Sequence, residues 1–133
     1  MKFIIVICCV FVFSVSYFNK KQANRDLESF IGTWKGTSLC QVKNSPCHDE
    51  IVVYFITKGN SPDSCVMNAN KIVNGKEEEM GTLYFRFDKT NNEIVSTAPN
   101  TEWKFKLRDG KLEGTLVYSN SLFRIIEAKR QAN

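Results

Sequence analysis

The feature that most constrains the fold is the alternation of apolar and polar residues that runs through the chain after residue 30. In the segment 102–108, Trp103, Phe105 and Leu107 are separated by basic residues, and two further segments repeat this pattern. Successive side chains of a strand point to opposite faces, so alternation of this kind predicts strands with one buried and one solvated face. The sequence therefore predicts an all-β chain.

Turn-forming residues separate these segments. Asn74-Gly75 and Asp109-Gly110 are typical of two-residue hairpin turns, and the other connections are rich in Gly, Asn, Asp and Pro. No segment after residue 30 has a helical period of useful length. Eight short strands joined by near-neighbour hairpins favour an antiparallel up-and-down barrel over a sandwich. The expected strands are residues 31–40, 49–57, 64–73, 80–88, 93–98, 102–108, 111–118 and 122–129.

The N-terminal residues have the pattern of a secretory signal. Lys2 precedes an apolar run over Phe3–Val15 that is broken only by Ser14, and Ser14 and Ser16 place small residues at the two positions that a signal peptidase reads. The run is shorter than the roughly 20 residues that cross a bilayer, so we expect no stable membrane span once the signal is removed. The expected organisation is a signal peptide at 1–16, a polar tether at 17–29 and a β-barrel domain at 30–130. A secreted or periplasmic location follows from the signal.

Three cysteines lie beyond the predicted signal: Cys40, Cys47 and Cys65. Export favours disulfides. Cys40 and Cys47 are close in sequence and flank a turn-like segment, so we expect them to pair and to leave Cys65 as a free thiol in a strand. Pairing of Cys65 with either of the other two is the alternative.

Charge and motifs exclude several classes of function. The net charge of +4 is spread along the chain, and its one dense charged run, Glu77–Glu79, is acidic. This distribution argues against a nucleic-acid partner. Neither a nucleophile elbow nor a phosphate-binding glycine loop occurs, and the chain has a single histidine. We therefore expect a protein that is not an enzyme and that needs no cofactor.

The histidine lies in the run Cys47-His48-Asp49-Glu50. On a strand His48 and Glu50 would share one side, and a third metal ligand would have to come from Glu77–Glu79 or from Cys65. The competing interpretation is that Asp49 bonds backbone amides at the turn and His48 is an exposed loop residue. We favour the second interpretation and expect no metal.

The start of the barrel segment resembles a known family. Gly32-Thr33-Trp34 is similar to the G-x-W signature that opens the first strand of lipocalins, fatty-acid-binding proteins and related barrels. In that family the Trp closes one end of the barrel, and an Arg or Lys of the last strand stacks across it. The resemblance implies a closure formed by Gly32, Trp34 and Arg124, because Arg124 lies in the last expected strand.

A second resemblance covers most of the chain after the signal. Several of its segments are similar to a group of small exported bacterial proteins without an assigned activity, so this likeness supports the fold and the export alone. The segments are Gly32-Thr33-Trp34, Cys40, residues 45–50, residues 71–76, Met80-Gly81 and residues 112–116.

A barrel of this size leaves two functions open. The favoured one is binding of a small apolar ligand inside the barrel. The alternative is a protein-binding module with a filled core, similar in architecture to barrel-shaped protease inhibitors, in which residues 17–29 would be the inhibitory tail. The candidate ligand-lining residues are Tyr54, Met67, Phe85, Phe87, Trp103 and Phe105.

Overall fold

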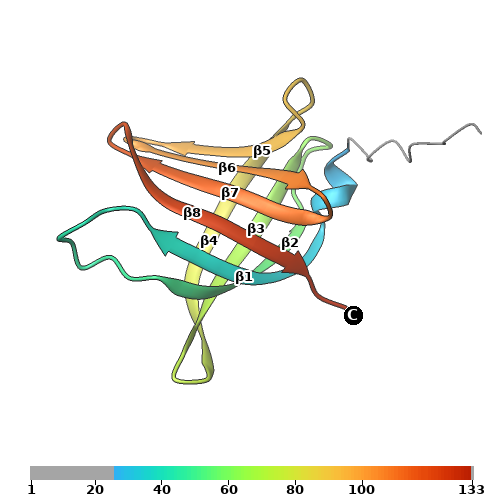
Figure 1. Ribbon diagram of the computed structural model, residues 1–133. Coiled ribbons are helices and arrows are strands. Elements are labelled where there is room, and N and C mark those ends of the chain that lie inside the picture. Colours follow the sequence, from blue (N-terminus) through green and yellow to red (C-terminus); the bar gives the residue numbers. More distant parts are fainter. Residues whose placement is uncertain (1–25, 133) are drawn as a thin grey trace, which may run out of the picture.

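The computed structural model, which describes residues 26–132, is a closed barrel of eight antiparallel strands in sequential order (Figure 1). Each strand pairs with its neighbours in the chain, and the last pairs with the first. The predicted fold class is therefore confirmed. The predicted signal peptide and most of the predicted tether lie outside the described residues. The strands are β1 (Gly32–Cys40), β2 (Glu50–Lys58), β3 (Ser64–Val73), β4 (Lys76–Asp88), β5 (Glu93–Ala98), β6 (Thr101–Arg108), β7 (Lys111–Tyr118) and β8 (Ser121–Arg130).

Strand β4 departs most from the expected bounds, since it starts at Lys76 instead of residue 80. Asn74 and Gly75 form the predicted tight turn, both with positive φ, and β4 then pairs with β3 from its first residue. The charged residues 76–79 do not alternate with apolar ones because this part of the hairpin is exposed on both sides. Pairing with β3, not burial, makes it a strand.

A short 3₁₀ helix, η1 (Leu27–Phe30), covers one end of the barrel, which we call the closed end. Asp26 caps it by accepting a hydrogen bond from the backbone N–H of Ser29 at 3.1 Å. Phe30 is fully buried and meets the ring of Phe87 edge-on at 5.9 Å. Phe30 therefore belongs to the core and Leu27 packs against it, although the sequence pattern placed residues 27–29 in the tether.

The closed end is completed by Trp34 and Arg130. The Arg130 guanidinium lies 4.2 Å from the Trp34 ring centroid and donates to the backbone oxygens of Ile31 and Ser29 at 2.6 and 2.5 Å. The indole N–H of Trp34 donates to the Phe30 carbonyl at 2.9 Å. These contacts tie η1 to both β1 and β8.

The prediction that Arg124 packs on Trp34 is wrong. The register places Arg130 opposite Trp34 and Arg124 opposite Cys40, near the other end of β1. Gly32 has a φ of +135°, and a Cβ there would lie 2.5 Å from Nη1 of Arg130. Glycine is thus the residue that lets the guanidinium of Arg130, not of Arg124, cross this end of the barrel.

The opposite end, which we call the mouth, is less regular. The β1–β2 connection and the β3–β4 hairpin extend beyond the barrel there (Figure 1). Strands β4 and β5 pair over three residues each, Arg86–Asp88 with Glu93–Val95, and these lie toward the closed end. The edge of β4 over residues 76–85 therefore has no ladder partner on β5.

The cysteines behave as expected. Cys40 and Cys47 are joined by a disulfide with their Cα atoms 5.9 Å apart, and it links the end of β1 to the β1–β2 connection. Cys65 is a free, buried thiol on β3. Within residues 26–132 we find no helix with the length and hydropathy of a membrane span.

Candidate functional site

Phe105 separates a filled part of the barrel interior from a hollow part. Its fully buried ring meets Tyr54 and Phe85 edge-on, both at 5.7 Å, and Trp103 stacks on its mouth side at 6.2 Å. Gly114 lies opposite Phe105 on β7, and a Cβ at Gly114 would come within 2.3 Å of this ring. On the closed-end side of Phe105, aromatic and aliphatic side chains fill the interior.

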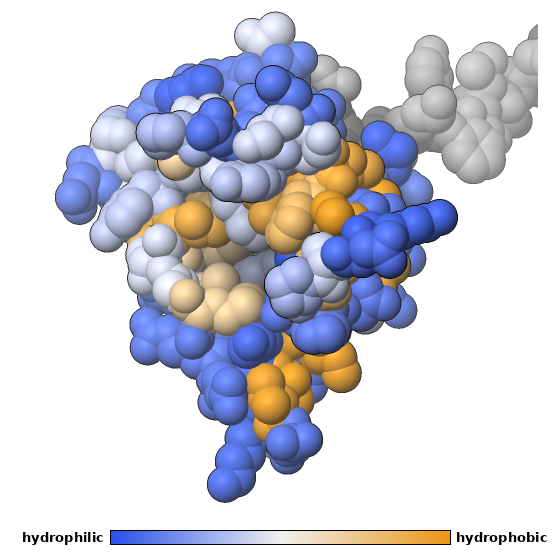
Figure 2. Space-filling view, turned by 90° about the vertical axis from the view of Figure 1, so that its left-hand side faces the viewer, coloured by the Kyte–Doolittle hydropathy of each residue, from blue (hydrophilic) through white to orange (hydrophobic). Residues whose placement is uncertain are grey.

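On the mouth side of Phe105 the interior is hollow. Two pockets, of about 220 and about 300 Å³, adjoin the indole of Trp103, which lines both. Figure 2 views this end and shows the depression in its centre. We call the two pockets together the mouth hollow. The smaller one is lined by Tyr54, Ala69, Met80, Gly81, Thr82, Leu83 and Trp103, and the larger by Thr101, Trp103, Leu116, Tyr118 and Phe123.

The structure divides the six predicted lining residues into those that line the mouth hollow and those that are buried in the core. Tyr54 and Trp103 line the mouth hollow. Met67, Phe85 and Phe105 are almost fully buried in the core, and Phe87 packs at the closed end. Sequence alternation placed all six on the inner face but could not tell which half of the barrel each one occupies. Whether any of them contacts a ligand stays a prediction.

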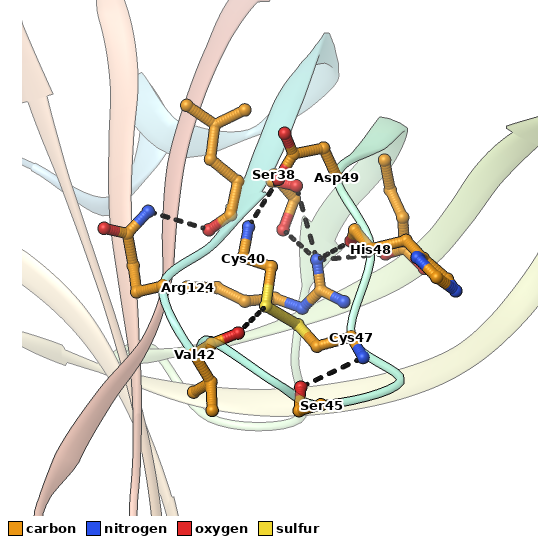
Figure 3. Close-up of a disulfide and its surroundings, with 11 residues drawn as sticks. Ser38, Cys40, Val42, Ser45, Cys47, His48, Asp49 and Arg124 are labelled. Atoms are coloured by element: carbon orange, nitrogen blue, oxygen red, sulfur yellow. Dashed lines mark hydrogen bonds and ion pairs between the residues drawn. A yellow bond between two sulfur atoms is a disulfide. The ribbon is translucent and has the colours of Figure 1, made fainter.

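A polar cluster lies beside the mouth hollow, around Arg124 (Figure 3). Its Nη1 donates to the carbonyl oxygen and the hydroxyl of Ser38, both at 3.3 Å, and to the carbonyl of His48 at 3.0 Å. The same nitrogen lies 3.5 Å from a carboxylate oxygen of Glu50. Arg124 thus holds β1, β8 and the disulfide-bonded connection together.

The cluster continues around the inner wall. Glu50 also pairs with Lys71 on β3, with Nζ and the carboxylate oxygen 3.8 Å apart. Burial raises the pKa of the Tyr54 hydroxyl well above its ordinary range. Arg124 partly opposes this shift in pKa, and the Glu50 carboxylate adds to it. Tyr54 therefore joins the apolar hollow to the charged cluster and carries a neutral hydroxyl.

The run His48-Asp49-Glu50 is used for structure. The Asp49 carboxylate accepts a hydrogen bond from the backbone N–H of Cys40 at 2.8 Å, which is the role of turn stabilisation expected for it. The His48 carbonyl accepts from Arg124. Among residues 26–132, no three His, Cys, Asp or Glu side chains lie close enough together to hold a metal ion.

A larger groove, of about 800 Å³, lies on the outside of the closed end. Its walls are η1, the β2–β3 turn and Lys89, and most of the lining side chains are polar or charged. An ion pair between Lys58 and Glu28 crosses it. The groove is a surface feature outside the barrel interior, so the mouth hollow is the better candidate for an apolar ligand.

Sequence reasoning missed several residues of the mouth. Leu83 and Leu116 share the inner face with the predicted aromatic residues, and their alternation was a signal that could have found them. Lys71 and Arg124 could have been found because each is an ionisable residue at a position where alternation predicts an inward-facing side chain. Placing them at the mouth requires the register between strands, which alternation alone does not give.

Comparison of the chain with known protein families and with curated proteins finds no match.

Proposed function

We propose that this protein binds a small apolar ligand in the mouth hollow. The observation that carries the proposal is the hollow itself, with Trp103 between its two pockets and Phe105 at its base. Pockets of about 220 and 300 Å³ are at the lower limit of ligand sites, which suits a small molecule. In this proposal the protein is a carrier and not an enzyme.

A neutral fluorescent probe, N-phenyl-1-naphthylamine, tests the proposal. We expect its emission to rise on binding to the wild type and to stay low with Ala69→Phe, which fills the smaller pocket with an added ring. Thr57→Phe is the matched control, because it adds the same ring to an exposed position of β2. Absence of binding to the wild type, or equal binding to Ala69→Phe, would refute the proposal.

We also propose that the barrel is of the lipocalin type and that the protein is exported. The G-x-W segment at the start of β1 and the guanidinium stacked on Trp34 support the first statement. The Cys40–Cys47 disulfide supports the second, because disulfides persist in oxidising compartments. N-terminal sequencing of the protein recovered from the medium or periplasm of its own host tests the export and locates the cleavage site.

A second candidate function is protein binding, and the free edge of β4 favours it. An unpaired edge offers backbone donors and acceptors to an added strand. Met80 and Tyr84, both on this strand, are 42% and 72% exposed. If this function holds, Tyr84→Glu abolishes capture of a specific exported protein in a pull-down and leaves probe binding unchanged, because Tyr84 lines neither pocket of the mouth hollow.

A further inference from the structure

The outer wall of the barrel carries an apolar patch near the mouth, on β8, β1 and β2. Leu39, Ile125 and Leu122 are 42%, 42% and 43% exposed, and Ile51 is 48% exposed. Leu39 and Ile125 are ladder partners, and Ile51 is the ladder partner of Thr37, the preceding outward residue of β1. None of the four hydrophobic side chains lines the mouth hollow. They form a surface separate from the proposed ligand site, and we call it the outer patch.

The β7–β8 ladder shows why Leu122 belongs to the outer patch. Its partner is Val117, whereas Ile125 pairs with Thr115, and a bulge on β8 accommodates the extra residue between them. Because Thr115 and Val117 are successive outward residues of β7, the bulge brings Leu122 next to Ile125 on the outside of the barrel. The outer patch is therefore continuous across the three strands.

Two lysines lie on the same face, on the closed-end side of the outer patch. Lys35 and Lys129 are ladder partners, and each lies four residues from a patch residue of its own strand, Leu39 and Ile125 respectively. Alternation therefore turns all four side chains outward, and both lysines are exposed. Like charges directly opposite each other destabilise a sheet, so this lysine pair favours an anionic partner.

The carboxylates of this face are bound to other groups. Glu127 pairs with Lys111 and Glu113 with Arg108, with the nitrogen and oxygen atoms 2.8 and 3.5 Å apart. Within residues 26–132 the lysine pair forms no ion pair. The acidic run Glu77–Glu79 lies on β4, which is on the far side of the eight-stranded barrel from β8. The face that carries the outer patch therefore has uncompensated positive charge.

Exposed aliphatic side chains beside uncompensated lysines fit the surface of a membrane that contains anionic lipids. Aliphatic side chains are stabilised at the boundary between headgroups and acyl chains, and lysine stems extend along an apolar surface with the ammonium group in water. An ammonium group close to an anionic lipid surface is attracted to it. Because the outer patch lies toward the mouth and the lysine pair toward the closed end, the mouth side would enter the lipid more deeply.

A second copy of the chain fits this face less well. The four side chains of the outer patch together expose on the order of 300 Å², whereas a stable interface between two proteins buries roughly 800 Å² on each partner. A second copy would also bring the same positive charge to the contact. Size and charge therefore both favour a lipid surface as the partner.

We propose that the protein docks peripherally on membranes rich in anionic lipid, with the outer patch in the headgroup region and the lysine pair on the lipid phosphates. This inference goes beyond the proposed ligand binding and does not depend on it. It requires no membrane-spanning segment, because only side chains from one face of the barrel enter the lipid.

Co-sedimentation of the protein, recovered from its own host, with lipid vesicles tests the inference. We expect binding to vesicles of phosphatidylglycerol mixed with phosphatidylcholine, and little binding to phosphatidylcholine alone. Ile125→Glu should abolish binding, because it removes an apolar contact and places a carboxylate against anionic lipid. Tyr84→Glu is the matched control, since it changes a side chain that is 72% exposed on β4, outside the outer patch. Thermal unfolding of both variants verifies that the barrel is folded.

A second pair of variants tests the role of the lysines. Lys35→Gln combined with Lys129→Gln should weaken binding to the anionic vesicles at least about tenfold. Lys76→Gln combined with Lys89→Gln removes the same charge from exposed positions elsewhere and should weaken it much less. An equal loss in the two double variants would show a general effect of net charge and would overturn the proposal.

Three further results would also overturn it: no binding to either kind of vesicle, equal binding to both kinds, or binding that persists in Ile125→Glu. Sedimentation equilibrium without lipid tests the competing partner. A dimer that Ile125→Glu dissociates would mean that a second copy of the chain, and not lipid, covers the outer patch.

Discussion

At the scale of single residues, the two inward-facing arginines of β8 have different roles. Arg130 packs on an aromatic ring and closes one end, whereas Arg124 lies among polar groups at the other end. They are six residues apart and share one face of the strand, so the alternating pattern predicts an inward side chain for both and does not distinguish their positions along the barrel. From the G-x-W resemblance we expected Arg124 to be the partner of Trp34, but the β1–β8 register makes Arg130 that partner.

The Arg130 stack leads to a stability prediction. Arg130→Ala removes the contact with Trp34 and two hydrogen bonds to backbone carbonyls, and should lower the free energy of unfolding by about 1–2 kcal/mol. Arg130→Lys should recover only part of this, because an ammonium cannot stack flat and donate to both carbonyls. Urea unfolding measures the effect, with Lys129→Ala as control. An unchanged midpoint for Arg130→Ala would show that the stack does not stabilise the barrel.

Cys65 makes stability depend on pH at the alkaline end. Burial raises the pKa of its thiol to about 11, from about 8.5 in an unfolded chain. The folded state thus favours the protonated thiol. The resulting contribution to the free energy of unfolding is fully present below the unfolded pKa and is lost as the pH rises from about 8.5 to 11. Cys65→Ala should flatten this part of the stability curve. The native thiol should also resist alkylation at neutral pH, and rapid labelling without unfolding would contradict its burial.

At the scale of elements, the disulfide joins the mouth polar cluster to β1. It closes a short loop with a sequence separation of 7, so the chain-entropy model gives a stabilisation of about 2–3 kcal/mol. Cys40→Ala combined with Cys47→Ala should lower the unfolding free energy by this amount and leave the barrel folded. Thermal unfolding with and without reductant checks the value. Loss of folding in the double variant would mean that the cluster around Arg124 depends on the disulfide for its assembly.

The sequence predicted the strands well because most of them have one buried face. Seven of the eight expected segments begin within two residues of the observed strands, and β4 is the exception because its first residues are charged and exposed. The Cys40–Cys47 pair followed from spacing. The division of the interior into a filled half and a hollow half could not be predicted, since it depends on which inward side chains meet at the same height of the barrel.

At the scale of the whole molecule, the two ends of the barrel differ in surface as well as in interior. The large hydrophobic side chains that remain exposed within residues 26–132 lie in the mouth half or at mid-barrel, and none lies at the closed end. The closed end instead carries the Trp34–Arg130 stack and η1. From this packing, strand pairing and surface we expect the closed end to be the more stable half and the mouth to open more readily.

This difference should be visible in native-state hydrogen exchange. Amides of the ladders around Trp34, Ile56 and Phe87 should exchange only by global unfolding, because they lie in the filled half. Amides of β4 over residues 79–84 that point away from β3, and those of β5 over residues 96–98 on its β4-facing edge, have no partner in the β4–β5 ladder and should exchange by local opening. Saturating N-phenyl-1-naphthylamine should slow exchange in the mouth half if the ligand seals it. Equal protection of both halves without ligand would mean that β4 and β5 come together in solution and that the mouth is closed.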